Sequence, residues 1–268
     1  MRGGKGRPFL EVFASALHED YRFPILEIFA FLYALGTFVF ASFVSMTSGS
    51  IMGEYAAYSV TSSLLGMPLF IFVILIFKNI AYGLGGDIEK GIIQTYFSYP
   101  LKRRWILSAK LLSALGVSLL LFLSIQISAL YVLAPDIVAP YLGTVILTYA
   151  ASLSFPLLIA GIMLLVTLVL RRGGLALVLG IVLFFALQII HSLAMFVAYA
   201  TESPLVLQIV SVISPNVVLG WYYQSFFYMG SLWTPTFTEA LLYLGASYTV
   251  VASLFLVGYL YFCRRLGL

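Results

Sequence analysis

Long apolar runs are the feature of this chain that most limits what it can fold into. A helix that crosses a bilayer needs about 20 predominantly apolar residues, and six stretches meet this requirement. They comprise residues 24–46, 58–77, 106–133, 141–170, 175–199 and 239–262. Membrane β-strands are shorter and alternate apolar with polar residues, whereas these runs are continuous and rich in leucine. We therefore predict an all-α polytopic membrane protein with six transmembrane helices.

The scarcity of charge supports the same conclusion. Only 9% of the 268 residues are charged, whereas about 25% are charged in an ordinary soluble domain. This composition excludes a soluble enzyme, and it excludes a disordered chain, which combines low hydrophobicity with high charge. The single cysteine, Cys263, excludes an internal disulfide and a cysteine metal cluster.

The basic residues define an orientation. In a six-helix topology all 14 of them fall on one side, while Glu54, Asp136 and Glu202 fall on the other. By the positive-inside rule the basic side is cytoplasmic, so we predict a multi-pass protein of the cell membrane with both termini in the cytoplasm. The basic residues are Arg2, Lys5, Arg7, Arg22, Lys78, Lys90, Lys102, Arg103, Arg104, Lys110, Arg171, Arg172, Arg264 and Arg265.

Two further segments are predicted to touch the membrane without crossing it. Residues 1–23 form a cytoplasmic N-terminus with an amphipathic helix in the interface plane, and residues 24–268 form a single six-span domain. Residues 204–229 are apolar but contain breaking residues. Counting them as a seventh span would place Arg264 and Arg265 outside, so we predict an external re-entrant or interfacial hairpin before the last span.

The connection between the second and third runs has a different composition. Asp87 follows three glycines and is predicted to cap a short helix over residues 88–97, which Pro100 then ends. From composition alone this segment is either a linker with basic anchors or a surface that contacts a partner. In order, it contains Glu89, Lys90, Gly91, Pro100, Arg103, Arg104, Ile106 and Lys110.

This pattern resembles the cytoplasmic-loop signature of ABC-2 type transporter permeases, in which Glu-x-Gly-Thr and a run of leucines precede Pro-x-Ser-Arg and then Gly-Lys. The chain departs from it at Ile92, Lys102 and Ala109, and has Tyr96 and Phe97 where leucines are usual. Family members have an interfacial elbow helix, six spans, cytoplasmic termini and a re-entrant hairpin before the last span. The resemblance therefore extends to the architecture predicted above.

The resemblance implies a permease subunit of an ATP-driven exporter of a hydrophobic or amphipathic substrate. It implies a homodimer, or a heterodimer with a similar permease, and two copies of a separate ATPase subunit that bind the ATP and Mg²⁺. The first cytoplasmic loop of such a permease is a coupling helix that docks on the ATPase. Here that helix corresponds to Asp87, Ile88, Glu89, Lys90, Gly91, Ile92, Gln94 and Thr95.

Motifs for catalysis are missing from the sequence. It contains no G-x-x-x-x-G-K-[ST] for ATP, no H-E-x-x-H for zinc and no G-x-S-x-G nucleophile. We therefore predict no catalytic residue, no metal site, no cofactor in this chain and no nucleic-acid partner. A secondary transporter and a non-transporting membrane scaffold are the alternative functions. An intramembrane enzyme would need a cluster of acid, base or metal ligands.

A few polar and aromatic residues inside the runs are candidate site residues. Gln126, Gln188 and His191 line either a substrate pathway or a subunit seam, or they form hydrogen bonds between helices. The aromatic residues near the external hairpin form either an interface belt or, by the resemblance, an outer gate. The gate candidates are Pro215, Trp221, Tyr222 and Phe226.

Overall fold

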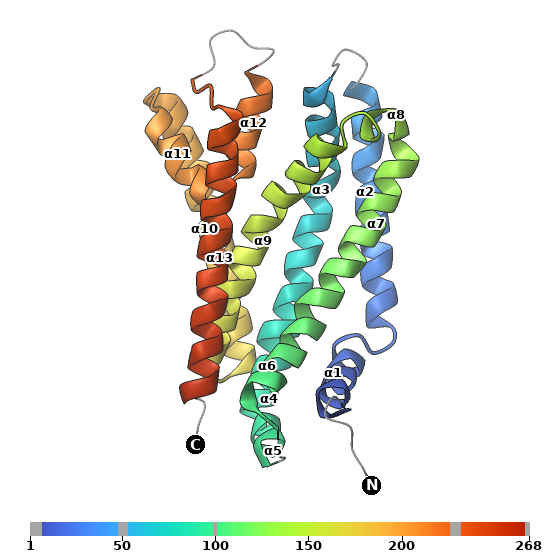
Figure 1. The fold of residues 1–268 in the computed structure, drawn as a ribbon, viewed down its shortest axis with the longest axis vertical. Coiled ribbons are helices and arrows are strands. Elements are labelled where there is room, and N and C mark those ends of the chain that lie inside the picture. The colour runs from blue at the N-terminus through green and yellow to red at the C-terminus, as the bar shows by residue number, and fades with distance from the viewer. Residues whose placement is uncertain (1–6, 48–52, 99–100, 226–231, 266–268) are drawn as a thin grey trace.

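The computed structural model describes residues 7–47, 53–98, 101–225 and 232–265, and in these ranges every regular element is a helix. Figure 1 shows a bundle in which long helices run between two ends of the molecule. The elements are α1 (Arg7–Asp20), α2 (Ile25–Thr47), α3 (Glu54–Ile76), η2 (Phe77–Leu84), α4 (Gly85–Glu89), α5 (Ile92–Ser98), α6 (Arg103–Leu111), η3 (Leu112–Val117), α7 (Ser118–Leu133), α8 (Pro135–Val138), α9 (Leu142–Leu170), α10 (Gly173–Ala200), α11 (Pro204–Ile213), α12 (Asn216–Gln224) and α13 (Phe237–Arg265).

Five helices in the described ranges are long and apolar enough to cross a membrane. They are Glu54–Glu89, Arg103–Leu133, Leu142–Leu170, Gly173–Ala200 and Phe237–Arg264. A sixth is obtained if α1 and α2, which meet at a bend of 63°, are counted together as one span. The prediction of an all-helical protein is therefore confirmed for the described residues, and of the six predicted spans five, or six with the bent pair, are long and apolar enough to cross a membrane.

Local sequence sets the start of several helices. Thr236 and Glu239 form a reciprocal capping box at the beginning of α13: the Thr236 amide donates to Glu239 Oε2 at 2.6 Å, and the Glu239 amide donates to Thr236 Oγ1 at 3.2 Å. Proline occupies the first turn of α8 and α11, where its missing N–H leaves no helical bond unmade. All three of these helix starts lie at the end of the bundle opposite the two termini (Figure 1).

The core lies along α3 and α9, which occupy the middle of the bundle in Figure 1. In the most apolar part of each of these helices 61% of the residues are buried, against 22% in α10 and 17% in α13. Tyr33, Phe72 and Phe122 join α2, α3 and α7 through aromatic contacts with ring centroids 5.4–5.7 Å apart. The outer helices thus leave broad apolar faces for lipid or for another protein.

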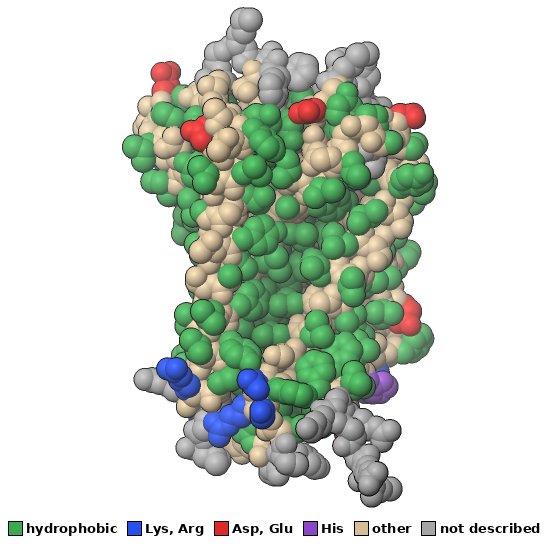
Figure 2. Space-filling model, viewed as in Figure 1, with side chains coloured by type: hydrophobic (Ala, Val, Ile, Leu, Met, Phe, Trp, Pro, Cys, Tyr) green, Lys and Arg blue, Asp and Glu red, His purple; other side chains and the backbone are tan. Residues whose placement is uncertain are grey.

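Basic side chains gather at one end of the molecule, whereas acidic side chains occur toward both ends. Figure 2 shows Lys and Arg at the end where both termini lie, acidic side chains at the opposite end, and one further acidic side chain nearer the basic residues, with an apolar band between the two ends. We call these the basic end and the acidic end. The basic end carries α1, α5 and the α9–α10 turn, and the acidic end carries α8, α11 and α12.

We expect the basic end to face the cytoplasm. Arg104, Arg172, Asp136 and Glu202 are all exposed, so a cysteine placed at any of them is accessible to a thiol reagent. In a Cys263→Ser background, an impermeant maleimide applied to intact cells should label cysteines at 136 and 202 and spare those at 104 and 172 until the membrane is permeabilised. Labelling at 172 from outside would overturn the orientation.

In its described part, residues 204–225, the segment predicted as a hairpin does not form a seventh long helix. The described part consists of two short helices, α11 and α12, which meet at Ser214 and Pro215. Neither is long enough to cross a membrane. The break follows from Pro215, which cannot donate a backbone hydrogen bond to a continuing helix.

Candidate functional site

The segment predicted to dock on a partner, residues 87–95, does not form one short helix but is divided between the end of α4 and the start of α5. The helix that begins at Glu54 continues through η2 and α4 to Glu89, so a helix capped by Asp87 and starting at Ile88 is wrong. The break comes at Gly91, whose φ of +74° is a left-handed conformation that favours glycine. The α5 helix follows and forms the tip of the basic end (Figure 1).

Only part of this segment is accessible from solvent. Lys90, Ile92, Gln94 and Thr95 are exposed, whereas Ile88 is half-buried. Two other residues point inward: Asp87 is 2% exposed, and Ile93, at 1%, belongs to the main core. The surface that a partner can reach is therefore the outer side of the Lys90–Gly91 turn and of α5.

Asp87 is buried because it pairs with a lysine on another helix. Lys110 Nζ lies 2.5 Å from Asp87 Oδ2 and 2.8 Å from Glu19 Oε2. Asp87 and Lys110 are both almost inaccessible, while half of the Glu19 side chain is exposed. This three-residue cluster, which we call the ionic clasp, joins α1, α4 and α6.

A second polar network docks the end of α1 against the two π-helical turns. The Tyr21 hydroxyl lies 2.7 Å from Ser118 Oγ and 3.2 Å from the Ser113 carbonyl oxygen, and Asn79 Nδ2 donates to Tyr21 at 3.1 Å. Asn79 lies in η2 and Ser113 in η3, where the wider helical turn alters the usual backbone pairing. Groups from η2, η3 and α7 therefore hold Tyr21, which lies between α1 and α2.

Asp20 belongs to the same junction. Its carboxylate accepts a hydrogen bond from Ser113 Oγ, and its backbone carbonyl accepts one from Lys78 Nζ. Burial raises the pKa of Asp20 to about 6, although the Ser113 hydrogen bond and the positive charges of Lys78 and Lys110 oppose the rise. The carboxyl group therefore keeps its proton to a higher pH than an exposed aspartate.

Glu89 has a partner within the chain. Its Oε2 accepts a hydrogen bond from the Gly173 amide at 2.9 Å, across 84 positions of sequence. Gly173 is the first residue of α10, where helix amides lack partners and the helix dipole favours a negative charge. This carboxylate therefore caps α10, while the Glu89 side chain stays exposed, and its contact with a partner stays a prediction.

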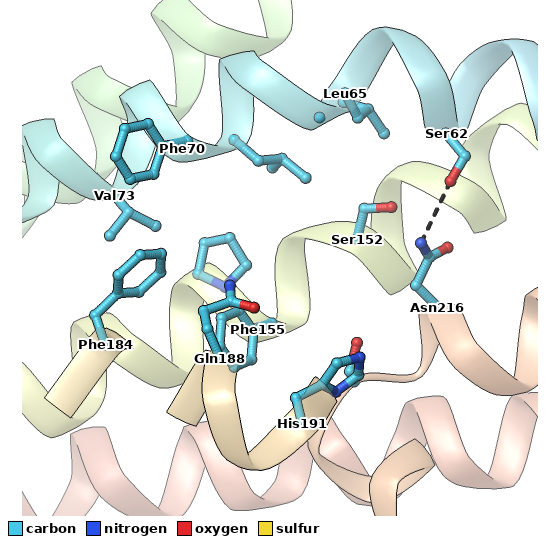
Figure 3. Close-up of a pocket in the computed structure, with 14 residues that line it drawn as sticks. Ser62, Leu65, Phe70, Val73, Ser152, Phe155, Phe184, Gln188, His191 and Asn216 are labelled. Atoms are coloured by element: carbon cyan, nitrogen blue, oxygen red, sulfur yellow. Dashed lines mark hydrogen bonds between the residues drawn. The ribbon is translucent and has the colours of Figure 1, made fainter. Parts of the chain in front are cut away.

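Gln188 and His191 line a cavity of about 270 Å³ toward the acidic half of the bundle. They share it with polar residues of α3, α9 and α12, among them Ser62, Ser152 and Asn216. Figure 3 shows Asn216 beside Ser62, to which its Nδ2 donates a hydrogen bond of 3.3 Å. Gln188 and His191 were predicted as candidate residues from the sequence, whereas Ser62, Ser152 and Asn216 were not.

Gln126 lies elsewhere and is 1% exposed. Its Nε2 donates to Thr37 Oγ1 at 2.5 Å, so it forms the interhelical hydrogen bond that was the alternative interpretation. The structure does not bring Gln126 to the cavity. The hydrogen bond between Gln126 and Thr37 joins α7 to α2.

The candidate gate residues are mainly packing residues of the acidic end. Pro215 is buried, and Trp221 is 8% exposed with its ring centroid 5.9 Å from that of Tyr199. Tyr222 is half-buried beside Phe237. Phe226 lies outside the described residues. Trp221 therefore belongs to an apolar core under the α11–α12 turn.

The chain matches no protein-family model and no curated protein. In the part of the chain that the structure describes, no group of three or more His, Cys, Asp or Glu side chains is arranged to hold a metal ion.

Proposed function

We propose that this chain is the permease subunit of an ATP-driven exporter of the ABC-2 type. It acts as a dimer, with itself or with a similar permease, and two copies of a separate ATPase subunit drive it by binding ATP and Mg²⁺. The substrate is hydrophobic or amphipathic. The resemblance of residues 85–110 to the family's loop signature and the succession of helices along the chain support this assignment.

The observation that carries the proposal is the exposed apolar residue Ile92 at the tip of the basic end. Ile92 is 36% exposed and sits between Gly91 and the core residue Ile93, with the polar Lys90, Gln94 and Thr95 nearby. Protein contacts commonly have an apolar centre surrounded by a polar rim. On the cytoplasmic side of the membrane it would fill an apolar pocket of the ATPase.

The connection from α5 to the bundle supports mechanical coupling. The helix from Glu54 to Glu89 is continuous, and Ile93 fixes α5 to the core. A push on α5 would therefore tilt the long helix as a rod, and the hydrogen bond from Gly173 to Glu89 would carry the movement to α10. The exposed apolar faces of α10 and α13 leave room for a second permease in the membrane.

The test replaces Ile92 with arginine. At an exposed position this change alters the free energy of unfolding by no more than about 0.5 kcal/mol, but in a contact it places an unpaired charge in an apolar pocket. We expect at least a ten-fold loss of the copurifying ATPase and of its ATP turnover, measured on protein purified from native membranes. Mass spectrometry should show that the partner contains a G-x-x-x-x-G-K-[ST] motif.

The matched control is Leu133→Arg at the acidic end, where Leu133 is the last residue of α7 and is 40% exposed. It should leave ATPase binding at the wild-type level. Glu89→Arg is unsuitable as a docking test, because Glu89 caps α10. Retention of the ATPase by Ile92→Arg would move the docking surface elsewhere, and the lack of any ATPase with the wild-type chain would favour a secondary transporter or a scaffold.

A further inference from the structure

The cavity lined by Gln188 and His191 has a polar end and an apolar end. Figure 3 shows Ser62, Ser152 and Asn216 at one end and Phe70, Val73 and Phe184 at the other. At the apolar end the ring centroids of Phe70 and Phe184 lie 6.0 Å apart. The cavity therefore offers an amphipathic environment inside the apolar band of the bundle.

Buried polar atoms at this cavity lack partners. Asn216 Oδ1 and Ser152 Oγ are fully buried and form no hydrogen bond with any described residue. Ser152 itself is 7% exposed. Buried polar groups are almost always satisfied in native proteins, so these two atoms indicate a ligand or bound water in the cavity.

A backbone carbonyl beside the cavity lacks its usual helical donor. Pro156 lies inside α9 and has no N–H to donate to the carbonyl of Ser152, four residues earlier in the helix. Both residues line the cavity. The Ser152 carbonyl is therefore available to accept a hydrogen bond from a group in the cavity.

The lining contains no charged side chain. Among its described residues there is no Asp, Glu, Lys or Arg, so an ion entering the cavity would lose its hydration without gaining a counter-charge. Gln188 and His191, which form no hydrogen bond with the described residues, offer neutral donors and acceptors. The chemistry of the lining selects an uncharged polar group.

We propose that this cavity binds a neutral amphipathic molecule that carries a hydroxyl or carboxamide group on an aromatic or aliphatic body. The polar group donates to Asn216 Oδ1 or to Ser152 and accepts from Gln188 or His191, while the body contacts Phe70 and Phe184. The volume of about 270 Å³ suits a small molecule, or one end of a larger one. Binding needs only this chain, so the proposal goes beyond the proposed function and does not require the ATPase.

The test uses benzophenone-4-carboxamide, a neutral aromatic amide that crosslinks on irradiation. The full chain is purified into lipid nanodiscs and irradiated at increasing probe concentration, and the labelled peptides are mapped by mass spectrometry. We expect saturable labelling of peptides from α3, α9 and α10 that line the cavity. The analogue 4-methylbenzophenone, which lacks the amide, should label diffusely and without saturation.

Two variants remove polar groups without breaking a bond within the described structure: Gln188→Leu and Ser152→Ala. Each should raise the half-saturating concentration of the carboxamide roughly five-fold, as loss of one buried hydrogen bond predicts. Gln208→Leu is the matched control, since Gln208 is half-buried on α11 and does not line the cavity. Thermal unfolding of every variant verifies that each is folded.

Equal labelling by the carboxamide and the methyl analogue would overturn the proposal, and so would unchanged saturation in both cavity variants. In either event the cavity holds only water. The probe should label the Ile92→Arg variant as it labels the wild type. Failure of ATPase docking can therefore be distinguished from failure of cavity binding.

Discussion

Replacing Lys110 with methionine is expected to lower the thermal unfolding midpoint of the detergent-purified protein by roughly 10 °C. Methionine keeps much of the length of the side chain but removes the cation that pairs with Asp87, which is 2% exposed, in the described part of the chain. Removing one partner of a buried ion pair costs about 3–5 kcal/mol, because the remaining charge stays buried and unpaired. Glu19 is half-exposed and can turn to water, so Asp87 dominates the loss.

The double variant Asp87→Leu/Lys110→Met should have an unfolding midpoint close to that of the wild type. It removes both buried charges, and well-packed apolar residues often replace a buried ion pair at little cost. The control is Lys102→Met, since Lys102 is exposed at the same end of the molecule. Equal midpoints for Lys110→Met and Lys102→Met would show that the ionic clasp does not stabilise the fold.

Gly85→Ala is expected to destabilise the protein although alanine is the better helix former. A Cβ at Gly85 would lie 2.8 Å from Gly173 Cα and 3.0 Å from Thr167 Cγ2. The first of these contacts is backbone, so α4 and α10 would have to separate. We expect a loss of about 1–3 kcal/mol from overpacking, measured as a lower unfolding midpoint, together with a weakened hydrogen bond from Gly173 to Glu89.

The neighbouring Gly86→Ala and Gly174→Ala provide matched controls. A Cβ at either position meets nothing within 4 Å, so each change should be neutral or should stabilise its helix by about 0.5–1 kcal/mol. Opposite signs at Gly85 and Gly86 would identify close backbone approach as the cause. A stabilising Gly85→Ala would contradict the contact between α4 and α10.

The sequence predicted the helices well because their cause is local. Each apolar run satisfies its backbone only as a helix, and residues such as Thr236 and Glu239 cap a helix that lies beside them in the chain. The helix start at Asp87 was wrong for a tertiary reason. Glycines usually interrupt a helix, but the contact of Gly85 with Gly173 uses the missing side chain and keeps the helix going to Glu89.

The candidate sites were predicted only in part. Gln188 and His191 share a face of one helix, which spacing on α10 predicts, and both line the cavity. Gln126 carries the same kind of side chain but meets Thr37 on another helix. The sequence does not reveal whether a glutamine lines the cavity, as Gln188 does, or bonds a neighbouring helix, as Gln126 does. The outcome depends on which helix packs against the face that carries it.

The sequence by itself determined the all-helical fold, the approximate positions of the apolar helices and the gathering of the basic residues at one end. These properties follow from hydrophobicity and from interactions within a few positions. Only the tertiary structure decided that Lys110 joins Glu19 to Asp87, that Glu89 caps α10, and that Ser152 and Asn216 face Gln188. Such contacts join segments many tens of residues apart, and the order of residues along the chain does not specify which helices become neighbours.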